Sequence, residues 1–230
     1  MGNTQNSIIN NLESHPLKNN MKKYKVYLFD FDGTLFNTLP SLYNVFKKSF
    51  EACGLTYDES KWERLTRIRL NDGFIEYGGK MEDFPKYCQM INKVLNTKET
   101  TELTETYDDT LELMEKLHNE SIISGIVTSN NVPHVQDVLS FYKIPLDTFD
   151  IYIGNQQFKN HKPDPEPIIK ALESINYKGE LNDVIYIGDA YNDCLCAINA
   201  GVDCYLLDRT KEIKDCPYKI IHSLKEIFDE

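Results

Sequence analysis

The chain has 230 residues, of which 41% are hydrophobic, and it carries a formal net charge of −11. This length and composition can bury a sizeable core in one large domain, or in one domain with an insert. The acidic balance argues against nucleic acid as a main partner, because binding to a phosphate backbone requires a basic surface. No apolar run reaches the roughly 18 residues that span a bilayer, so we expect no membrane insertion.

The six cysteines show no C-x-x-C pattern and no dense framework, which indicates reduced thiols in a cytoplasmic protein. Cys194 and Cys196 are expected to pack as small apolar residues on a helix. Residues 1–20 are rich in Asn and Ser and are predicted to form a flexible N-terminal extension. The sequence contains no sustained heptad repeat, so the oligomeric state stays open.

A buried strand is predicted at Val26–Phe31, and it runs into a turn at Asp32-Gly33. An ionised Asp30 at the end of such a strand costs several kcal/mol unless a cation or several donors meet it. Alternation along the strand places Asp30 and Asp32 on the same side. Two carboxylates that converge in this way suit Mg²⁺ better than zinc. In a simpler interpretation, the Asp-Gly turn only ends the strand.

The next stretch is predicted to be helical. Helices are expected at 40–50, from Ser60 onward and at Phe84–Leu95, where apolar residues recur at helical spacing. No convincing strand is present between them. Residues 39–105 are therefore predicted to form a small all-helical insert.

Strands and helices alternate in the rest of the chain. Strands are predicted at 122–127, 151–153, 184–187, 205–207 and 219–221, and helices at 108–117, 132–142, 165–175, 193–200 and 224–228. This alternation predicts an α/β fold with a Rossmann-like, doubly wound parallel sheet covered on both faces. Ligands of such sheets bind beyond the carboxyl ends of the strands.

Further polar residues, whose side chains can take part in binding or catalysis, follow the predicted strands or open the following helices. Each group also has a simpler interpretation as a helix cap or as solvated surface. Their common placement at strand ends favours a shared site. These residues are Thr128, Ser129, Asn130, Lys162, Asp189 and Asp193.

The string D-F-D-G-T-L-F-N-T, which begins at Asp30, resembles the first motif of the haloacid dehalogenase-like hydrolase superfamily. Thr128, Lys162 in K-P-x-P, and Asp189 with Asp193 resemble its later motifs, in the same order. The resemblance covers about residues 21–230. The insert resembles the helical cap of the phosphoglycolate phosphatase-like branch. The resemblance to this family therefore implies a catalytic core at 21–38 and 106–230, and a cap at 39–105.

The resemblance also implies a mechanism. Mg²⁺ would be held by the Asp30 carboxylate, the Asp32 carbonyl and Asp189, and Asp193 would orient this ligand shell. Asp30 would be the nucleophile and Asp32 the general acid and base. The phosphate group would be bound by Thr128, Ser129, Asn130 and Lys162. The expected enzyme is a Mg²⁺-dependent phosphatase that hydrolyses the phosphoric monoester of a small phosphorylated metabolite through an aspartyl-phosphate.

Two alternatives remain open. One is a phosphomutase of the β-phosphoglucomutase type, which uses the same pair of aspartates. The other is a non-catalytic phosphate-binding regulator on the same fold, although a binder does not need the proton-transferring Asp32. The substrate is not determined by the sequence. Three cap arginines, Arg64, Arg67 and Arg69, either contact a second anionic group of the substrate or are only solvated.

Overall fold

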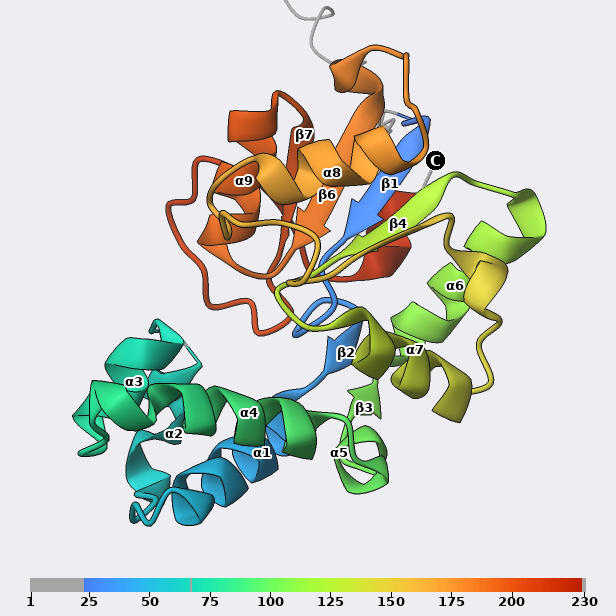
Figure 1. Cartoon of the computed structure of the whole chain (residues 1–230). Helices are drawn as coiled ribbons and strands as arrows, with labels where there is room; N and C mark the ends of the chain where they lie inside the picture. Colours follow the sequence, from blue (N-terminus) through green and yellow to red (C-terminus); the bar gives the residue numbers. More distant parts are fainter. Residues whose placement is uncertain (1–22, 67, 229–230) are drawn as a thin grey trace, which may run out of the picture.

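The computed structural model describes residues 23–66 and 68–228 (Figure 1). The predicted N-terminal extension at 1–20 lies outside the described residues, as does Arg67. Among the helices that the structure describes, none is long and apolar enough to cross a membrane.

A six-stranded sheet forms the centre of the molecule. Its strands lie in the order β5-β4-β1-β6-β7-β8, and each neighbouring pair is parallel. The chain therefore leaves the central strand β1 toward both edges, and in such sheets the crevice at this switch point binds ligands. The predicted α/β fold is confirmed. The strands are β1 (Val26–Phe29), β4 (Ser124–Val127), β5 (Ile151–Ile153), β6 (Val184–Gly188), β7 (Asp203–Leu207) and β8 (Lys219–Ile221).

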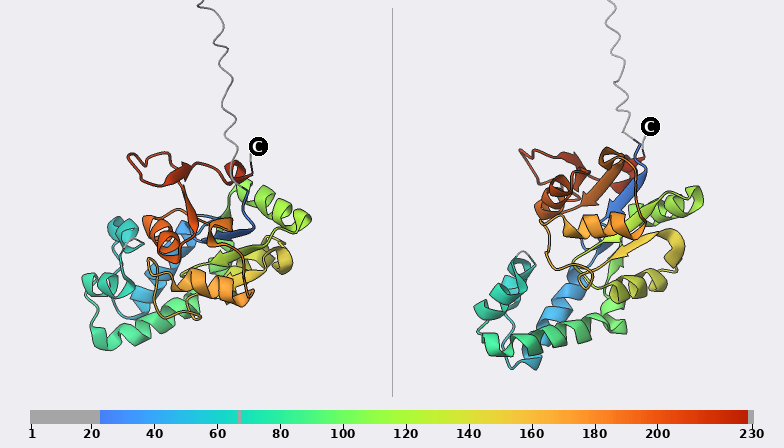
Figure 2. Two further views of the ribbon diagram at one scale, coloured as in Figure 1. Left: turned by 90° about the horizontal axis from the view of Figure 1, so that it is seen from above. Right: turned by 45° about the horizontal axis from the view of Figure 1, so that its top comes forward.

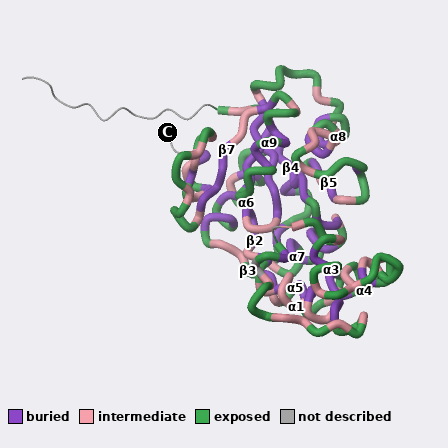
Figure 3. The backbone as a smooth tube through the Cα atoms, turned by 90° about the vertical axis from the view of Figure 1, so that its left-hand side faces the viewer, coloured by how far each residue is buried: buried purple, intermediate pink, exposed green. Residues whose placement is uncertain are grey.

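Helices cover both faces of the sheet, which explains why its strands are almost entirely apolar. Tyr27 and Phe29 of β1 pack in one core with α6 (Asp108–Glu120) and α7 (Val132–Phe141). Val26 and Leu28 point the other way and pack with α8 (Glu166–Ser174) and α9 (Tyr191–Ala200). Buried residues accordingly run along the strands between the helices (Figure 3). Alternation along β1 thus divides the core into two layers.

The helices between β2 and β3 gather at one end of the molecule, and the arrowhead of β1 points toward them (Figures 1 and 2). They have an aromatic core of their own, in which the ring centroids of Phe50 and Tyr77 lie 4.5 Å apart and those of Phe74 and Tyr87 4.6 Å apart. This separate core makes them a compact unit beside the sheet. The helices are α1 (Leu39–Ala52), α2 (Trp62–Leu65), α3 (Leu70–Glu76), α4 (Phe84–Leu95) and α5 (Lys98–Glu102).

Two short strands join the helical unit to the sheet. β2 (Phe36–Asn37) and β3 (Glu105–Thr106) pair antiparallel, so the two linkers lie side by side. Strands of two residues are too short for alternation to reveal them, and neither was predicted from the sequence.

Two expected helices differ in the structure. The helix expected from Ser60 is broken into η1 (Glu59–Lys61), α2 and α3; Asp58 caps η1 by accepting a 3.0 Å hydrogen bond from the Ser60 N–H. The closing helix expected at 224–228 is the 3₁₀ turn η5 (Leu224–Ile227). Three other 3₁₀ turns are η2 (Met81–Asp83), η3 (Leu146–Thr148) and η4 (Leu181–Asp183).

The expectation that all six cysteines are reduced is wrong for one pair. Cys194 in α9 and Cys204 in β7 form a disulfide, with Cα atoms 5.4 Å apart. The turn at the end of α9 returns the chain along this helix, and the two cysteines therefore meet across ten residues. Cys196 is free and buried, as predicted.

Candidate active site

Asp30 lies at the carboxyl end of β1, where its backbone N–H donates a 2.8 Å hydrogen bond to the carbonyl of Ile187 in β6. Its side chain is only 12% exposed and forms an ion pair of 2.9 Å with the ammonium of Lys162. Lys162 reaches the site from the loop before α8 and also contacts Asp193 Oδ1 at 2.8 Å. Three residues selected from the sequence therefore meet at one point.

Asp193, in the first turn of α9, is held by several donors. Its Oδ1 accepts from Lys162 at 2.8 Å, and its Oδ2 accepts from the Ala190 N–H at 3.0 Å. The hydroxyl of Tyr186 lies 3.4 Å from Oδ1 and donates to the Val127 carbonyl at 2.8 Å. Since both carboxylate oxygens already have partners, Asp193 is suited to hold Lys162 in place. Nothing in the sequence signalled Tyr186, which occupies an ordinary strand position.

Asp189 directly follows β6 and lies against the turn after β1. Its Oδ1 accepts a 3.1 Å hydrogen bond from the hydroxyl of Thr34. Gly33 has a φ of +74°, and a Cβ on this residue would lie 2.4 Å from Asp189 Oδ2. Only glycine satisfies both requirements. Thr34 lies within the quoted motif, but its contact with Asp189 could not be inferred from it.

Asp32 is met by neutral donors from the end of β4. The hydroxyl of Thr128 lies 3.3 Å from Asp32 Oδ2, and the amide nitrogen of Asn130 lies 3.4 Å from Asp32 Oδ1. These distances are long for hydrogen bonds, so the donors remain available to a nearby anion. Thr128 also accepts a 3.0 Å hydrogen bond from the Asn130 N–H. Ser129 is exposed at the same turn.

The carboxylates of this site leave a local excess of negative charge. Oxygen atoms of Asp30, Asp189 and Asp193 lie within 4.8 Å of one another, and Lys162 is the cation that contacts two of them. Burial raises the pKa of Asp30 well above its ordinary value; Lys162 opposes this shift, and the neighbouring carboxylates add to it. Such a group of hard oxygen atoms fits Mg²⁺, and the charge of a divalent cation would offset the repulsion.

Two of the three arginines that were expected in the cap, Arg64 and Arg69, lie among the described residues. Arg64 is 61% exposed in its side chain and forms an ion pair of 2.9 Å with Glu76 in α3. Arg69 is exposed at the start of α3. Arg64 is therefore engaged within the helical unit.

The family model of haloacid dehalogenase-like hydrolases matches residues 27–207. The chain belongs to this family. Its relatives include the pyrophosphatases PpaX of Halalkalibacterium halodurans, which is 30% identical over 182 residues (76% of this chain and 79% of that protein), and of Bacillus cereus, which is 28% identical over 186 residues (78% of this chain and 81% of that protein).

Comparison with solved structures supports the same family assignment. A Bacteroides fragilis protein assigned to the haloacid dehalogenase-like hydrolases has a TM-score of 0.76 and 28% identity, and the match covers 89% of this chain and all of that one. A Lactobacillus plantarum protein assigned as a phosphoglycolate phosphatase has a TM-score of 0.69 and 25% identity, with 80% and 86% covered. The family and fold expected from the sequence are confirmed. The chain is a haloacid dehalogenase-like hydrolase, and its relatives include phosphatases.

Proposed function

We propose that this haloacid dehalogenase-like hydrolase is a Mg²⁺-dependent phosphatase that acts on a small phosphorylated metabolite through an aspartyl-phosphate on Asp30. The observation that carries the proposal is the buried contact of Asp30 with Lys162 at the switch point of the sheet. Burying a carboxylate costs free energy of desolvation. Buried titratable groups of this kind cluster at functional sites, where they take part in chemistry or bind a cation.

The roles follow from the geometry. Asp30 attacks phosphorus and the leaving oxygen departs, which divides hydrolysis into two easier steps. Lys162 stabilises negative charge on the phosphoryl oxygens, together with the hydroxyl of Thr128 and the amide of Asn130. Ser129 and the N–H groups of its turn complete the phosphate site. Asp193 keeps Lys162 in place through the 2.8 Å contact.

Asp32 acts as the proton-transfer group in both steps. It protonates the leaving oxygen, and it then takes a proton from the water that attacks the aspartyl-phosphate. Its carboxyl group lies beside the carboxyl end of β4, with Oδ2 3.3 Å from the hydroxyl of Thr128 and Oδ1 3.4 Å from the amide nitrogen of Asn130. Asp30 and Asp32 therefore need opposite protonation states.

The residues that would hold Mg²⁺ are Asp30, Asp189 and the main-chain carbonyl of Asp32. A bound Mg²⁺ supplies charge neutralisation at the phosphoryl oxygens. The helical unit of residues 39–105 would act as a cap over the carboxyl ends of β1 and β6, and would exclude water from the site.

The test is phosphate release from a panel of substrates, with and without Mg²⁺. Pyrophosphate comes first because the named relatives are pyrophosphatases; phosphoglycolate, sugar phosphates and nucleotides follow. Asp30→Asn should abolish release. Asp150→Asn is the matched control, since Asp150 lies at the amino ends of β5 and β4, away from the carboxyl ends that carry the site, and accepts from the Ser124 N–H at 3.0 Å. Release by Asp30→Asn near the wild-type rate would refute the assignment.

The two alternatives give different results in this assay. A phosphomutase would release little phosphate but would convert one sugar phosphate into its isomer. A non-catalytic regulator would bind phosphate and turn over no compound of the panel. Either result would replace the proposal.

A further inference from the structure

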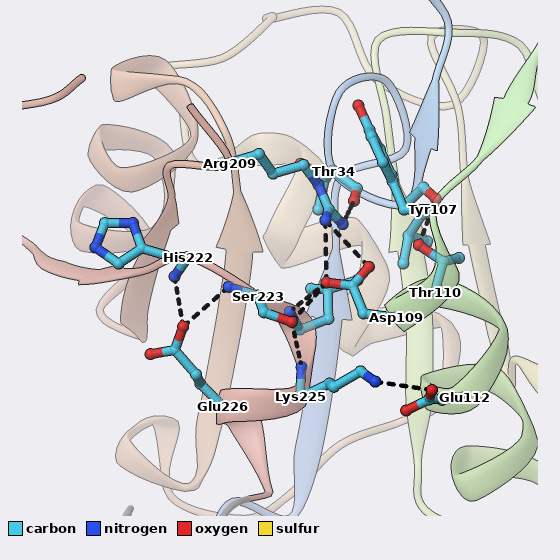
Figure 4. A network of polar contacts seen from close by, with 12 residues as sticks. Thr34, Tyr107, Asp109, Thr110, Glu112, Arg209, His222, Ser223, Lys225 and Glu226 are labelled. Atoms are coloured by element: carbon cyan, nitrogen blue, oxygen red, sulfur yellow. Dashed lines mark hydrogen bonds and ion pairs between the residues drawn. The ribbon is translucent and has the colours of Figure 1, made fainter. Parts of the chain in front are cut away.

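Arg209 connects three segments that lie far apart in the sequence (Figure 4). Its Nη1 donates to both oxygens of Asp109 at 3.0 Å, and its Nη2 donates to the carbonyl of Thr34 at 2.7 Å. Its guanidinium carbon lies 3.7 Å from the ring centroid of Tyr107. The Arg209 side chain is 17% exposed and that of Asp109 is 8% exposed. A guanidinium in this setting has a fixed orientation, because its planar fork is bound on two sides and stacked on a ring.

The contacts of Arg209 lie at the core ends of both linkers to the helical unit. Thr34 stands two residues before β2, and Tyr107 directly follows β3. Asp109 lies in the first turn of α6, where it also accepts from Ser223 Oγ at 2.8 Å and from the Leu224 N–H at 2.9 Å. The network therefore connects the two linkers to Ser223 and Leu224.

The same network reaches the acidic cluster. Thr34, whose carbonyl is bound by Arg209, donates its hydroxyl to Asp189 Oδ1 at 3.1 Å. Thr34 is fully buried, and Gly33 beside it leaves no room for a Cβ against Asp189. The position of Asp189 therefore depends on the turn that Arg209 holds.

We propose that Arg209, anchored by Asp109, is a positioning residue that fixes the Thr34 turn and thereby orients the Asp189 carboxylate for divalent cation binding. The inference rests on the proposed function, because it assumes that Asp189 is a ligand. A purely structural ion pair would affect the stability of the protein but not its affinity for a cation.

The experiment measures Mg²⁺ binding by isothermal titration calorimetry on the full chain without substrate. Arg209→Met should weaken the affinity about tenfold, the lower end of the 10–100-fold effect of residues that orient metal ligands. Arg209→Lys can still pair with Asp109 but cannot bind Thr34 at the same time, so it should fold well and still weaken binding. Lys225→Met is the matched control, because its 2.8 Å pair with Glu112 lies in the same region but does not contact the Thr34 turn.

A double-mutant cycle tests the route through Thr34. Thr34→Val removes the hydroxyl that binds Asp189, and it should weaken Mg²⁺ binding to a similar degree without disturbing the Arg209–Asp109 pair. In the double variant with Arg209→Met, the loss should be no greater than in the weaker-binding single variant, because both changes act on one contact.

The outcomes separate the inference from the proposed function. If the wild type binds Mg²⁺ and folded Arg209→Lys binds it within twofold of the wild type, the positioning role is refuted while the phosphatase proposal stands. If the wild type itself binds no Mg²⁺, both are refuted. Loss of affinity in both Arg209 variants, with Lys225→Met unchanged, supports the role.

Discussion

Replacement of Lys162 by Met tests the electrostatics of the buried site. The change keeps most of the aliphatic stem and removes the ammonium, so Asp30 and Asp193 lose their shared partner at 2.9 and 2.8 Å. The side chains involved are 7%, 12% and 2% exposed for Lys162, Asp30 and Asp193. Removing one partner of a buried ion pair costs roughly 3–5 kcal/mol, because a charge remains buried without compensation.

Urea unfolding at pH 7 without divalent cations measures this cost. With a denaturant slope of about 2–3 kcal/mol per M, the midpoint should fall by roughly 1–2.5 M. The control is Lys225→Met, which removes an exposed and solvent-screened pair with Glu112 and should leave the midpoint almost unchanged.

A second variant identifies the cause of the loss. Adding Asp30→Asn to Lys162→Met removes one uncompensated charge and should recover part of the lost stability. The electrostatic reasoning fails if Lys162→Met loses no more than Lys225→Met, or if the double variant is no more stable than Lys162→Met.

Three further changes test other parts of the site. Asp32→Asn should lower turnover by roughly 10²–10⁴-fold, and steady-state kinetics on the best substrate that showed a smaller loss would contradict its role in proton transfer. Gly33→Ala adds a Cβ 2.4 Å from Asp189 Oδ2 at a φ of +74°; calorimetry should show weaker Mg²⁺ binding, and unchanged affinity would argue against the close approach. Asp109→Asn should destabilise the protein at pH 7. Burial alone would raise the pKa of Asp109, but hydrogen bonds from Arg209, Leu224 and Ser223 outweigh it and lower this pKa in the folded state. The ionised Asp109 therefore stabilises the fold above its unfolded pKa of about 4, and this stabilisation is lost as the pH falls through the folded pKa. Urea titrations of wild type and variant should therefore converge at acidic pH, and a constant difference would refute this explanation.

The sequence predicted the sheet well because its signals are local. The buried strand predicted at Val26–Phe31, which the structure ends at Phe29, the helix at Phe84–Leu95 and the strand at Ile151–Ile153 all show a clear period or a continuous apolar run. The predicted site residues were also informative, since Asp30, Lys162 and Asp193 do meet. Short or irregular elements were harder: β2 and β3 have two residues each, and two residues show no period.

The tertiary structure alone decided which distant residues share a contact. The order β5-β4-β1-β6-β7-β8 places Arg209 beside Asp109, 100 residues away, and beside Thr34, 175 residues away. The packing of α9 against β7 brings Cys204 to Cys194. Local periodicity determines which face of a strand or helix is buried. The neighbours across that face depend on the strand order and on how the linkers pack, and no pattern within a short window of sequence contains this information.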